Sequence, residues 1–445
     1  MTLRRVFLTL TSLPICFAAA QGETTPSAWL DFFAFDSLRG TLARDHQPRA
    51  VFHEGTHRRT YFTYMDHEFD ARVVAYDLDD KKWSEVVRVD DCRTRDGHNA
   101  PAILVAKDGT LHLFYGCHGH PVKYARSRRP EDITEWETGM EIGSHATYTY
   151  AIQRKNGDLL LFYRFGGAGR QSPLKVHASR DGGNTWDEGH VILDYGEGSW
   201  VKIRDTLYDE ERDLVHLALW EGNMKYWNAF YAVYDPTKER VLALDGADLG
   251  SLADKEALLK HGSGVVRSNA RADLDLFLCQ GKPFFVLADP PAKRIFFAHW
   301  DKDRLSKTEI PQTLVKGLTQ FELFAEDENH FHLYGLCNTE PATTFSGNDL
   351  LVWKSSDGGK TWNEPRVLVD RRTLQHGLTG LNLTENYPGA GPFVWTQEEW
   401  LERSENLPRV RGSILDDAAF RFNKRLYALD ETYAFVRRDA RVASQ

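Results

Sequence analysis

Two segments of this chain share one eight-residue pattern. Residues 179–186 read Ser-Arg-Asp-Gly-Gly-Asn-Thr-Trp, and residues 355–362 read Ser-Ser-Asp-Gly-Gly-Lys-Thr-Trp. In such a turn the aspartate accepts hydrogen bonds from backbone N–H groups and a glycine adopts positive φ. The tryptophan ring then packs back over the sheet. Each copy follows a run of residues typical of a β-strand, so the pattern predicts a fold built from repeated β-sheet units.

Weaker acidic turns recur along the chain, both before the first copy and between the two copies, at roughly the spacing of a four-stranded blade. They lie at residues 76–83, 127–136, 234–236 and 300–303. The eight-residue pattern resembles the Asp box of sialidase-like β-propellers, and the spacing predicts six blades. Residues 29–35 and 393–436 would supply a seventh. We therefore expect an all-β, seven-bladed β-propeller with Asp-box turns, closed by N- and C-terminal strands, rather than a β-sandwich.

The N-terminus has the features of a signal peptide. Arg4 and Arg5 precede a mostly apolar stretch over residues 6–18, and three alanines at residues 18–20 form a small-residue cleavage site. The apolar stretch is short for a membrane anchor. We therefore predict cleavage after residue 20, a secreted or periplasmic location, and one propeller domain over residues 21–445.

The charge of the chain limits its partners. The formal net charge is −9, and loss of Arg4 and Arg5 with the signal peptide would leave −11. A net field of this sign argues against nucleic-acid binding. The sequence also predicts no membrane association and a monomer. Four cysteines remain after cleavage, which allows three disulfide pairings and selects none of them.

The residues whose side chains are best suited to catalysis are concentrated between positions 96 and 126. His98 and His118 bracket a strand-like run, and Tyr163 ends the corresponding run one blade further on. Arg180 lies just inside the first Asp-box turn. In a propeller the first strands of each blade line the central channel, so these four side chains are predicted to face one cavity.

The same region resembles a known family. Residues 98–101 read His-Asn-Ala-Pro, residues 114–119 read Phe-Tyr-Gly-Cys-His-Gly, and residues 123–127 read Lys-Tyr-Ala-Arg-Ser. These motifs are similar to those of the BNR-type propeller polysaccharide lyases, the ulvan lyases of families PL24 and PL25. The resemblance implies a catalytic propeller domain whose active site consists of His98, His118, Tyr163 and Arg180. Cys117 departs from the small residue expected at its position.

A uronate lyase removes the proton at C5, beside a carboxylate, and expels the sugar linked at O4. The resemblance assigns Arg180, helped by His118, to the substrate carboxylate, where a cation stabilises the developing negative charge. His98 and Tyr163 are the candidate base and acid. In glucuronate both groups leave from one side, so Tyr163 could serve twice. In iduronate they leave from opposite faces, which favours His98 as base and Tyr163 as acid.

Further residues are candidates for holding the substrate, an anionic and sulfated polysaccharide such as ulvan. The predicted substrate-binding residues are Asn99, Lys123, Tyr124, Arg126, Arg164 and Arg204, with Lys202 as an additional basic residue. Candidates for stacking on sugars are Tyr148, Tyr226 and Trp227, besides Tyr124.

A second group of residues has the chemistry of zinc ligands. His261, Cys279, His299 and Cys337 are predicted at or near strand ends in neighbouring blades, and four nitrogen and sulfur ligands suit structural Zn²⁺. Their spacing matches no recognised zinc motif, and buried thiols with a core histidine are the alternative interpretation. No cofactor is expected for catalysis.

Two other functions compete with the lyase. A propeller glycoside hydrolase, either sialidase-like or acting on rhamnosyl-glucuronate, would also carry Asp boxes, although the Arg-Ile-Pro element of sialidases is absent from the sequence. A non-catalytic glycan-binding propeller would keep aromatic and basic residues but has no need of two histidines, a tyrosine and an arginine around one channel. Only a lyase generates a conjugated double bond in its product.

Overall fold

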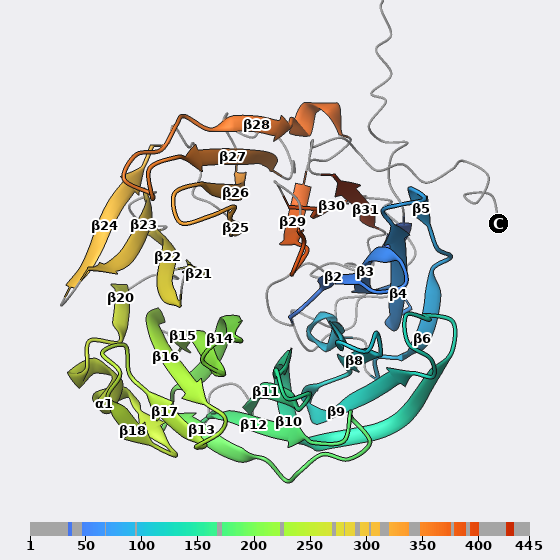
Figure 1. Ribbon diagram of the computed structural model, residues 1–445, viewed down its shortest axis with the longest axis horizontal. Coiled ribbons are helices and arrows are strands. Elements are labelled where there is room, and N and C mark those ends of the chain that lie inside the picture. The colour runs from blue at the N-terminus through green and yellow to red at the C-terminus, as the bar shows by residue number, and fades with distance from the viewer. Residues whose placement is uncertain are drawn as a thin grey trace, which may run out of the picture.

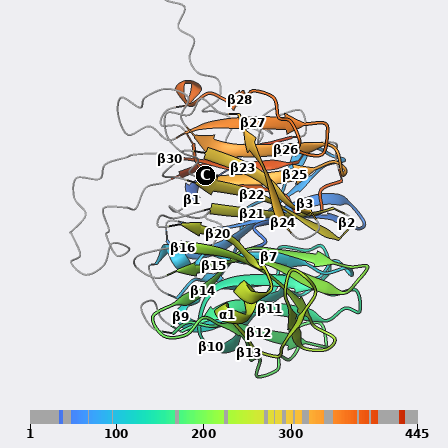
Figure 2. The same cartoon turned by 90° about the vertical axis from the view of Figure 1, so that its left-hand side faces the viewer.

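A computed structural model shows that the protein is an all-β propeller, as the sequence predicts. The sheets follow one another around a central axis (Figure 1). From the side, the sheets of β21–β28 lie above those of β7–β16 (Figure 2). The structure describes residues 34–37, 47–66, 68–93, 96–166, 171–222, 227–268, 273–279, 281–289, 294–301, 304–311, 320–337, 348–374, 378–388, 392–399 and 424–430. The predicted signal peptide lies outside these residues.

Five sheets are each built mainly from strands that are close in the sequence, and we refer to them as blades. The first blade contains β2 (Ala50–Glu54), β3 (Arg58–Met65), β4 (Asp70–Asp77), β5 (Lys82–Trp83) and β6 (Val87–Asp91). The second follows a 3₁₀ helix, η2 (Gly97–Asn99), and contains β7 (Ala102–Val105), β8 (Leu111–Tyr115), β9 (His118–Ser127), β10 (Trp136–Gln153), β11 (Leu159–Phe165), β12 (Leu174–Ser179), β13 (His190–Asp194) and the short parallel strand β19 (Ala253–Asp254).

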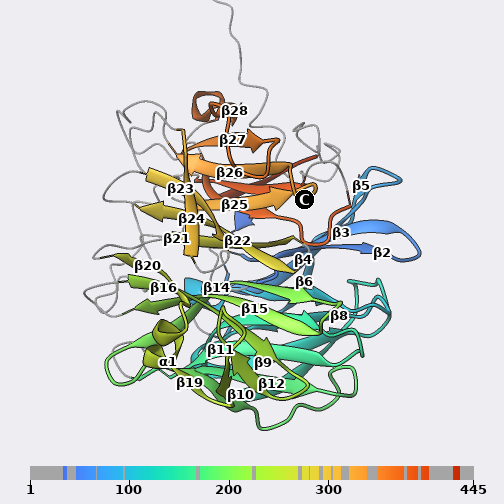
Figure 3. The ribbon, with the colours of Figure 1, turned by 60° about the vertical axis from the view of Figure 1, so that its left-hand side comes forward.

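The third blade carries the one α-helix of the described residues, α1 (Lys255–Lys260), which lies at the outer side of the ring (Figure 3). Its strands are β14 (Trp200–Asp209), β15 (Leu214–Gly222), β16 (Trp227–Asp235), β17 (Arg240–Leu242), β18 (Asp248–Gly250) and β20 (Gly264–Ser268). The fourth blade contains β21 (Asp273–Cys279), β22 (Lys282–Asp289), β23 (Arg294–Asp301) and β24 (Arg304–Ile310). The fifth contains β25 (Gln320–Ala325), β26 (Phe331–Cys337), β27 (Asp349–Ser355) and β28 (Arg366–Val369), followed by the 3₁₀ helix η3 (Arg371–Thr373).

The remaining sheet joins the two ends of the chain. It pairs β1 (Ala34–Ser37) with β31 (Lys424–Leu429) and continues through β30 (Val394–Glu399) and β29 (Leu378–Leu383). Pairing the two ends in one sheet leaves fewer strand edges open in the ring.

The predicted number of seven blades is wrong. The described strands form five blades and the closing sheet, because β10 joins two predicted blades into one sheet of eight strands. The first half of β10 pairs with β9 and the second half pairs with β11. The two halves of this sheet still pack on one another through a buried cluster that contains Phe114, Leu161 and Tyr163.

Apolar side chains hold neighbouring sheets together around the ring. One buried cluster joins the first blade to β7–β9, and another joins it to the closing sheet. Further clusters lie between β10–β13 and the third blade, and between each later pair of sheets. The core is therefore a series of layers between sheets, and it leaves strand ends and their loops to line the two ends of the ring.

Both Asp-box turns have the expected hydrogen bonds. In the first, Thr185 donates from its backbone N–H and its hydroxyl to the two oxygens of Asp181, at 2.9 and 2.6 Å. Thr361 makes the same two bonds to Asp357, at 2.9 and 2.6 Å. These bonds, led by that of the Thr361 hydroxyl, lower the pKa of Asp357 to about 2. The ring of Trp186 packs edge-on against Phe114, with centroids 5.8 Å apart, and so fixes the turn to the preceding strands.

Replacement of Gly183 by alanine should destabilise the propeller more than the same change at Gly182. Both residues have positive φ, at 86° and 66°, so both changes introduce backbone strain of about 1 kcal/mol. At Gly183 a Cβ would also lie 1.9 Å from the Tyr124 hydroxyl, whereas at Gly182 it would meet no atom within 4 Å. Calorimetry should show a lower Tm for Gly183→Ala than for Gly182→Ala. Equal values would contradict this account of the turn.

Acid should destabilise the fold through three buried histidines. Burial lowers the pKa of His112, His216 and His332 from 6.5 to about 4. The unfolded chain therefore binds more protons between these values, and stability falls as pH falls from about 6.5 towards 4, by up to about 1.4 kcal/mol for each pKa unit. The fall in Tm between pH 7 and pH 4.5 should be smaller in His216→Gln than in wild type. An unchanged fall would rule out a contribution from His216.

Candidate active site

The two predicted catalytic histidines share one carboxylate. Asp96 begins η2 and accepts a hydrogen bond from the backbone N–H of His98 at 3.0 Å. Its Oδ1 also lies 2.9 Å from Nδ1 of His98, and its Oδ2 is hydrogen-bonded to Nδ1 of His118, the first residue of β9. A single carboxylate thus orients both imidazole rings.

The two rings stack and remain partly open to solvent. Their centroids lie 4.6 Å apart at an interplanar angle of 28°, and the side chains of His98 and His118 are 23% and 27% exposed. When an Nδ1–H donates to Asp96, the Nε2 of that neutral ring is left as a proton acceptor. Partial burial favours the protonated acid at Asp96, but the hydrogen bonds from His118 and His98 hold its pKa well below the usual range. The group therefore combines an ionised carboxylate with two candidate bases.

Strand register brings further residues to the histidines. On β10, Thr147 is the partner of His118 on one side and of Arg164 on the other. Directly paired residues in adjacent strands project on the same face of a sheet. The register of β10 shifts immediately after Thr147, where Tyr148 has a φ of 62°. This left-handed conformation is costly for a tyrosine and is typical of strained functional positions.

Tyr148 lies beside the histidines and beneath two cations. Its ring centroid is 5.8 Å from that of His98 and 6.5 Å from that of His118. The guanidinium carbon of Arg164 lies 4.7 Å from the Tyr148 ring centroid, and Nζ of Lys202 lies 4.2 Å from it. Histidine, tyrosine and cationic groups therefore meet in one place.

The positive region continues into the third blade. Lys202 and Arg204 are buried on β14, and the Arg204 guanidinium lies 4.3 Å from the ring of Trp220 on β15. Lys202 lies 5.6 Å from the same ring. Such cation–π contacts help to hold the cations in place. We call Asp96, His98, His118, Tyr148, Arg164 and Lys202 the histidine site.

Tyr163, the predicted catalytic tyrosine, occupies a different environment. It precedes Arg164, and successive residues of a strand point to opposite faces. Its ring is fully buried, and its hydroxyl lies 2.8 Å from Nε2 of His177. Burial raises the pKa of Tyr163 to about 12, whereas an acid–base role at neutral pH would need a lower value. The structure does not place Tyr163 in the histidine site, and its catalytic role remains a prediction.

The pairing of Tyr163 with His177 recurs elsewhere in the propeller. Nδ1 of His112 lies 2.6 Å from the Tyr124 hydroxyl, and Nδ1 of His216 lies 2.5 Å from the Tyr231 hydroxyl. Each pair joins adjacent strands diagonally: β8 to β9, β11 to β12, and β15 to β16. Such repetition indicates a structural device that satisfies buried polar groups. Tyr124, which was predicted to bind substrate, belongs to one of these structural pairs.

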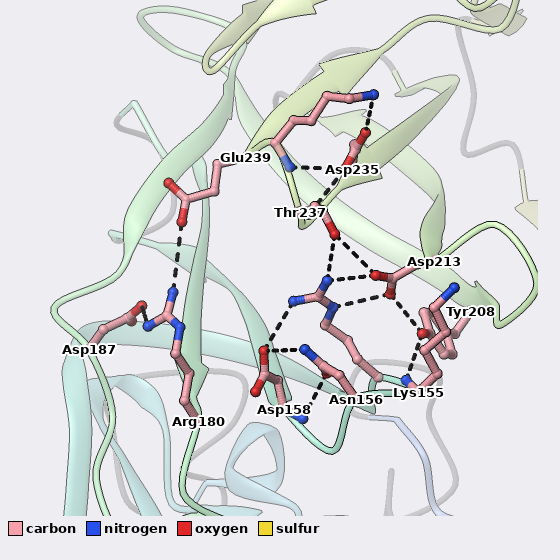
Figure 4. Close-up of polar contacts among 12 residues, drawn as sticks. Lys155, Asn156, Asp158, Arg180, Asp187, Tyr208, Asp213, Asp235, Thr237 and Glu239 are labelled. Carbon is pink, nitrogen blue, oxygen red and sulfur yellow. Dashed lines mark hydrogen bonds and ion pairs between the residues drawn. The ribbon is translucent and has the colours of Figure 1, made fainter.

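Arg180 lies outside the histidine site. Its side chain is 62% exposed and forms long ion pairs with Asp187 at 3.7 Å and Glu239 at 3.9 Å (Figure 4). It follows β12 at the Asp-box turn, whereas Arg164 lies near the end of β11, at the opposite end of the strands. Arg164, predicted only to bind substrate, therefore occupies the position beside the histidines that was expected of Arg180. A role for Arg180 at the substrate carboxylate remains a prediction.

The other predicted substrate-binding residues differ in position. Asn99 is buried next to His98, and Arg204 extends the cationic region. Lys123 forms ion pairs with Asp90 at 2.8 Å and Asp91 at 3.1 Å. Arg126 donates to Glu137 and to Asn184 of the Asp-box turn, at 2.7 and 2.8 Å. Lys123 and Arg126 therefore have acidic or turn partners away from the histidines. Tyr226 and the side chain of Trp227 lie outside the described residues.

The predicted zinc ligands make other contacts where they are described. His261 caps the C-terminal end of α1, and its Nδ1 lies 2.9 Å from Oδ2 of Asp245. His299 packs against Phe284, and Cys337 is a buried free thiol, as are Cys92 and Cys117. The side chain of Cys279 lies outside the described residues, so the zinc site remains a prediction. Among the described residues, the group whose ligand atoms lie close enough to hold a metal ion is Asp96, His98 and His118, within 4.8 Å of one another.

Two residues of the histidine site were not recognised from sequence. Asp96 stands two residues before His98, and its position as a helix-capping acid was the available signal. Tyr148 was considered only for sugar stacking, because nothing in a sequence marks a tyrosine for positive φ. The structure thus keeps the predicted histidines and changes their partners.

The comparisons with known proteins agree with the resemblance seen in the motifs, which is confirmed. Residues 59–218 match a family described as "BNR repeat-containing family member". A protein named ulvan lyase from Nonlabens ulvanivorans is 24% identical over 425 residues, which cover 83% of this chain and 87% of that protein. The protein named Ulvan Lyase-PL25 from Pseudoalteromonas sp. (strain PLSV) is 30% identical over 200 residues, 40% of each chain.

Solved structures give the same fold. A structure described as a PL25 ulvan lyase has a TM-score of 0.72 and 18% identity, over 92% of this chain and 97% of that one. A second, described as bound to -[GlcA(1-4)Rha3S]-, has a TM-score of 0.71 with the same identity and coverage. None of the helices in the described part of this chain is long and apolar enough to cross a membrane.

Proposed function

We propose that this chain, a relative of the ulvan lyases of the BNR-repeat propeller type, is a polysaccharide lyase that cleaves ulvan by β-elimination at a uronic acid. The observation that carries the proposal is the histidine site. Two imidazoles oriented by Asp96 face Tyr148, and Arg164 and Lys202 lie over the same tyrosine ring. The arrangement supplies a proton acceptor, a proton donor and a place for a carboxylate.

The cations address the difficult part of the reaction. The C5 proton of a uronate is weakly acidic because its removal adds negative charge beside an existing carboxylate. Arg164 and Lys202 can bind that carboxylate and stabilise the enolate-like charge as it develops. An arginine in this position also orients a carboxylate through two parallel hydrogen bonds.

The proton transfers follow from the tautomers that Asp96 selects. Nε2 of His98 takes the C5 proton, the electron pair forms the C4–C5 double bond, and the C4–O4 bond breaks. The Tyr148 hydroxyl donates its proton to the leaving O4. Asp96 stabilises the imidazolium formed on His98 and does not have to accept the proton itself. This order suits iduronate, in which the two groups leave from opposite faces. For glucuronate, Tyr148 would first remove the C5 proton and then protonate the leaving O4.

A hydrolytic mechanism has less support from the geometry. Glycoside hydrolases commonly use two carboxyl groups on either side of the bond, about 5–9.5 Å apart. In the histidine site the carboxylate is Asp96, and both of its oxygens are occupied by histidines. The relatives found by sequence are likewise named ulvan lyases.

Export is part of the proposal. The apolar N-terminal segment with its small-residue cleavage site supports secretion or a periplasmic location, where the enzyme would meet a polysaccharide substrate. Ulvan incubated with the purified chain should gain ultraviolet absorbance from 4,5-unsaturated uronate ends. Reducing ends produced without that absorbance would indicate a hydrolase instead.

Loss of the Tyr148 hydroxyl should impair catalysis more than loss of the Tyr163 hydroxyl. Tyr148→Phe removes the proposed acid, so kcat should fall by about a hundredfold or more. Tyr163→Phe removes a buried hydrogen bond to His177, so its main effect should be a loss of about 1 kcal/mol in stability. Initial rates of absorbance increase and Tm values measure the two effects. The opposite pattern would return the catalytic role to Tyr163.

Replacement of Asp96 by asparagine should alter the pH profile as well as the rate. A neutral amide accepts a hydrogen bond but does not stabilise a protonated imidazole, so kcat should fall by at least about tenfold. The acidic limb of kcat/KM should move to lower pH, because the histidines are then protonated less readily. A lower rate with an unchanged pH profile would mean that Asp96 only orients the rings. Asp91→Asn, which alters a carboxylate paired with Lys123, is the matched control.

A further inference from the structure

A cavity lies between turns of the eight-stranded sheet. It has a volume of about 550 Å³ and is lined by the turn after β7, the end of β9, the turn from β10 to β11 and the first Asp-box turn. Four separate segments of chain converge there, and the Asp-box hydrogen bonds fix one of them. The cavity is therefore a feature of the folded sheet rather than of one loop.

This cavity lies at the opposite end of the strands from the histidine site. His118 begins β9 and belongs to the histidine site, whereas Arg126, near the end of the same strand, lines the cavity. Eight steps along a strand span about 26 Å. Arg164 likewise lies near the end of β11, and Leu159 at its start lines the cavity. A ligand in the cavity would not touch the residues proposed for catalysis.

The lining is positive although the chain is acidic overall. Lys107, Arg126, Arg128 and Lys155 line the cavity, with two carboxylates, Asp108 and Asp181. Both carboxylates accept hydrogen bonds within their own turns: Asp108 from the backbone N–H of Thr110 at 2.9 Å, and Asp181 from Thr185. The lining thus gathers four cations and two acids, although Glu210 and Glu137 outside the lining pair with Lys107 and Arg126.

Three of the cations are available to an incoming anion. Arg128 and Lys155 are exposed, and Lys155 Nζ donates a long hydrogen bond, 3.4 Å, to the carbonyl of Glu211. Lys107 pairs with Glu210, but both side chains are more than half exposed, so the pair is weak in water. Arg126 is different, because its guanidinium is bound to Glu137 and Asn184.

The remaining lining favours charged groups over neutral sugar rings. Among the described residues that line the cavity there is no Trp, Tyr or Phe, so these residues offer no aromatic surface of the kind that stacks on sugar faces. Asn156 and Asn184 supply amides that can bond hydroxyl groups. Sulfate and carboxylate groups carried on a hydroxyl-rich chain fit this combination.

We propose that this cavity is a second binding site for an anionic polysaccharide, which holds sulfate or carboxylate groups of the polymer away from the histidine site. The choice of polymer rests on the proposed function, since ulvan is the anionic polysaccharide cleaved at the first site. A chain held at both ends of the blade would be retained by the enzyme between cleavages, because a second contact raises the effective concentration of the polymer at the first.

The test reverses the charge of the available cations. Arg128→Glu combined with Lys155→Glu should weaken retention in native gels that contain ulvan, measured in a His98→Ala background that leaves the polymer intact. With His98 restored, the double variant should raise KM for long ulvan several-fold and leave kcat/KM for short ulvan oligosaccharides unchanged. Lys354→Glu with Lys360→Glu is the matched control: it changes net charge equally at β27 and the second Asp-box turn.

Three results would overturn the proposal. These are unchanged retention of the double variant, an equal loss of retention in the control, and an equal loss of activity on long and short substrates. The gel assay needs no turnover, so it separates this proposal from the proposed function. Wild-type protein that yields no unsaturated product would refute the lyase, whereas a specific loss of retention would still support the cavity as a polysaccharide site.

Discussion

The histidine site depends on the hydrogen bonding of one strand, β10, to a neighbour on each side. Thr147 pairs with His118 of β9 and with Arg164 of β11, so the register of one residue fixes the distance between a candidate base and a cation. A shift of one residue would turn these side chains to the other face of the sheet. The apolar cluster between the two halves of the sheet opposes such a shift, because it would move Ile142 and Ala151 of β10 out of the cluster.

The same strand explains why the blades could be located from the sequence but not counted. The Asp boxes place their turns correctly, since aspartate, glycine and threonine act within eight residues. Gly139 and Gly143 within β10 would normally indicate turns. In the structure their positive φ values of 96° and 63° accompany irregularities in a continuous strand of 18 residues. Whether a glycine ends a strand or bends it depends on partners that are distant in sequence.

The site shows the same division between local and distant information. His98 and His118 were predicted to face one cavity because they bracket a strand-like run, and in the structure the two strands of a hairpin, β7 and β8, lie between them. Tyr163 and Arg164 were both considered from the sequence. Because neighbouring residues of a strand point to opposite faces, Tyr163 faces His177 in the core and Arg164 faces Tyr148. The choice between them requires knowledge of which face of β11 lines the site. Predicting the role of Tyr148 requires still more structural information, because its orientation depends on a positive φ that only tertiary packing can maintain.

Asp96 determines how charge is distributed in the finished site. Its carboxylate is ionised and stays so, because both histidines donate to it. A proton taken by one histidine is therefore balanced by a charge that is already present and already oriented. Arg164 and Lys202 are held over the Tyr148 ring, beside the two histidines. The positive charge needed to bind a uronate and the negative charge needed to stabilise an imidazolium thus lie in adjacent parts of one site, on separate segments of the chain.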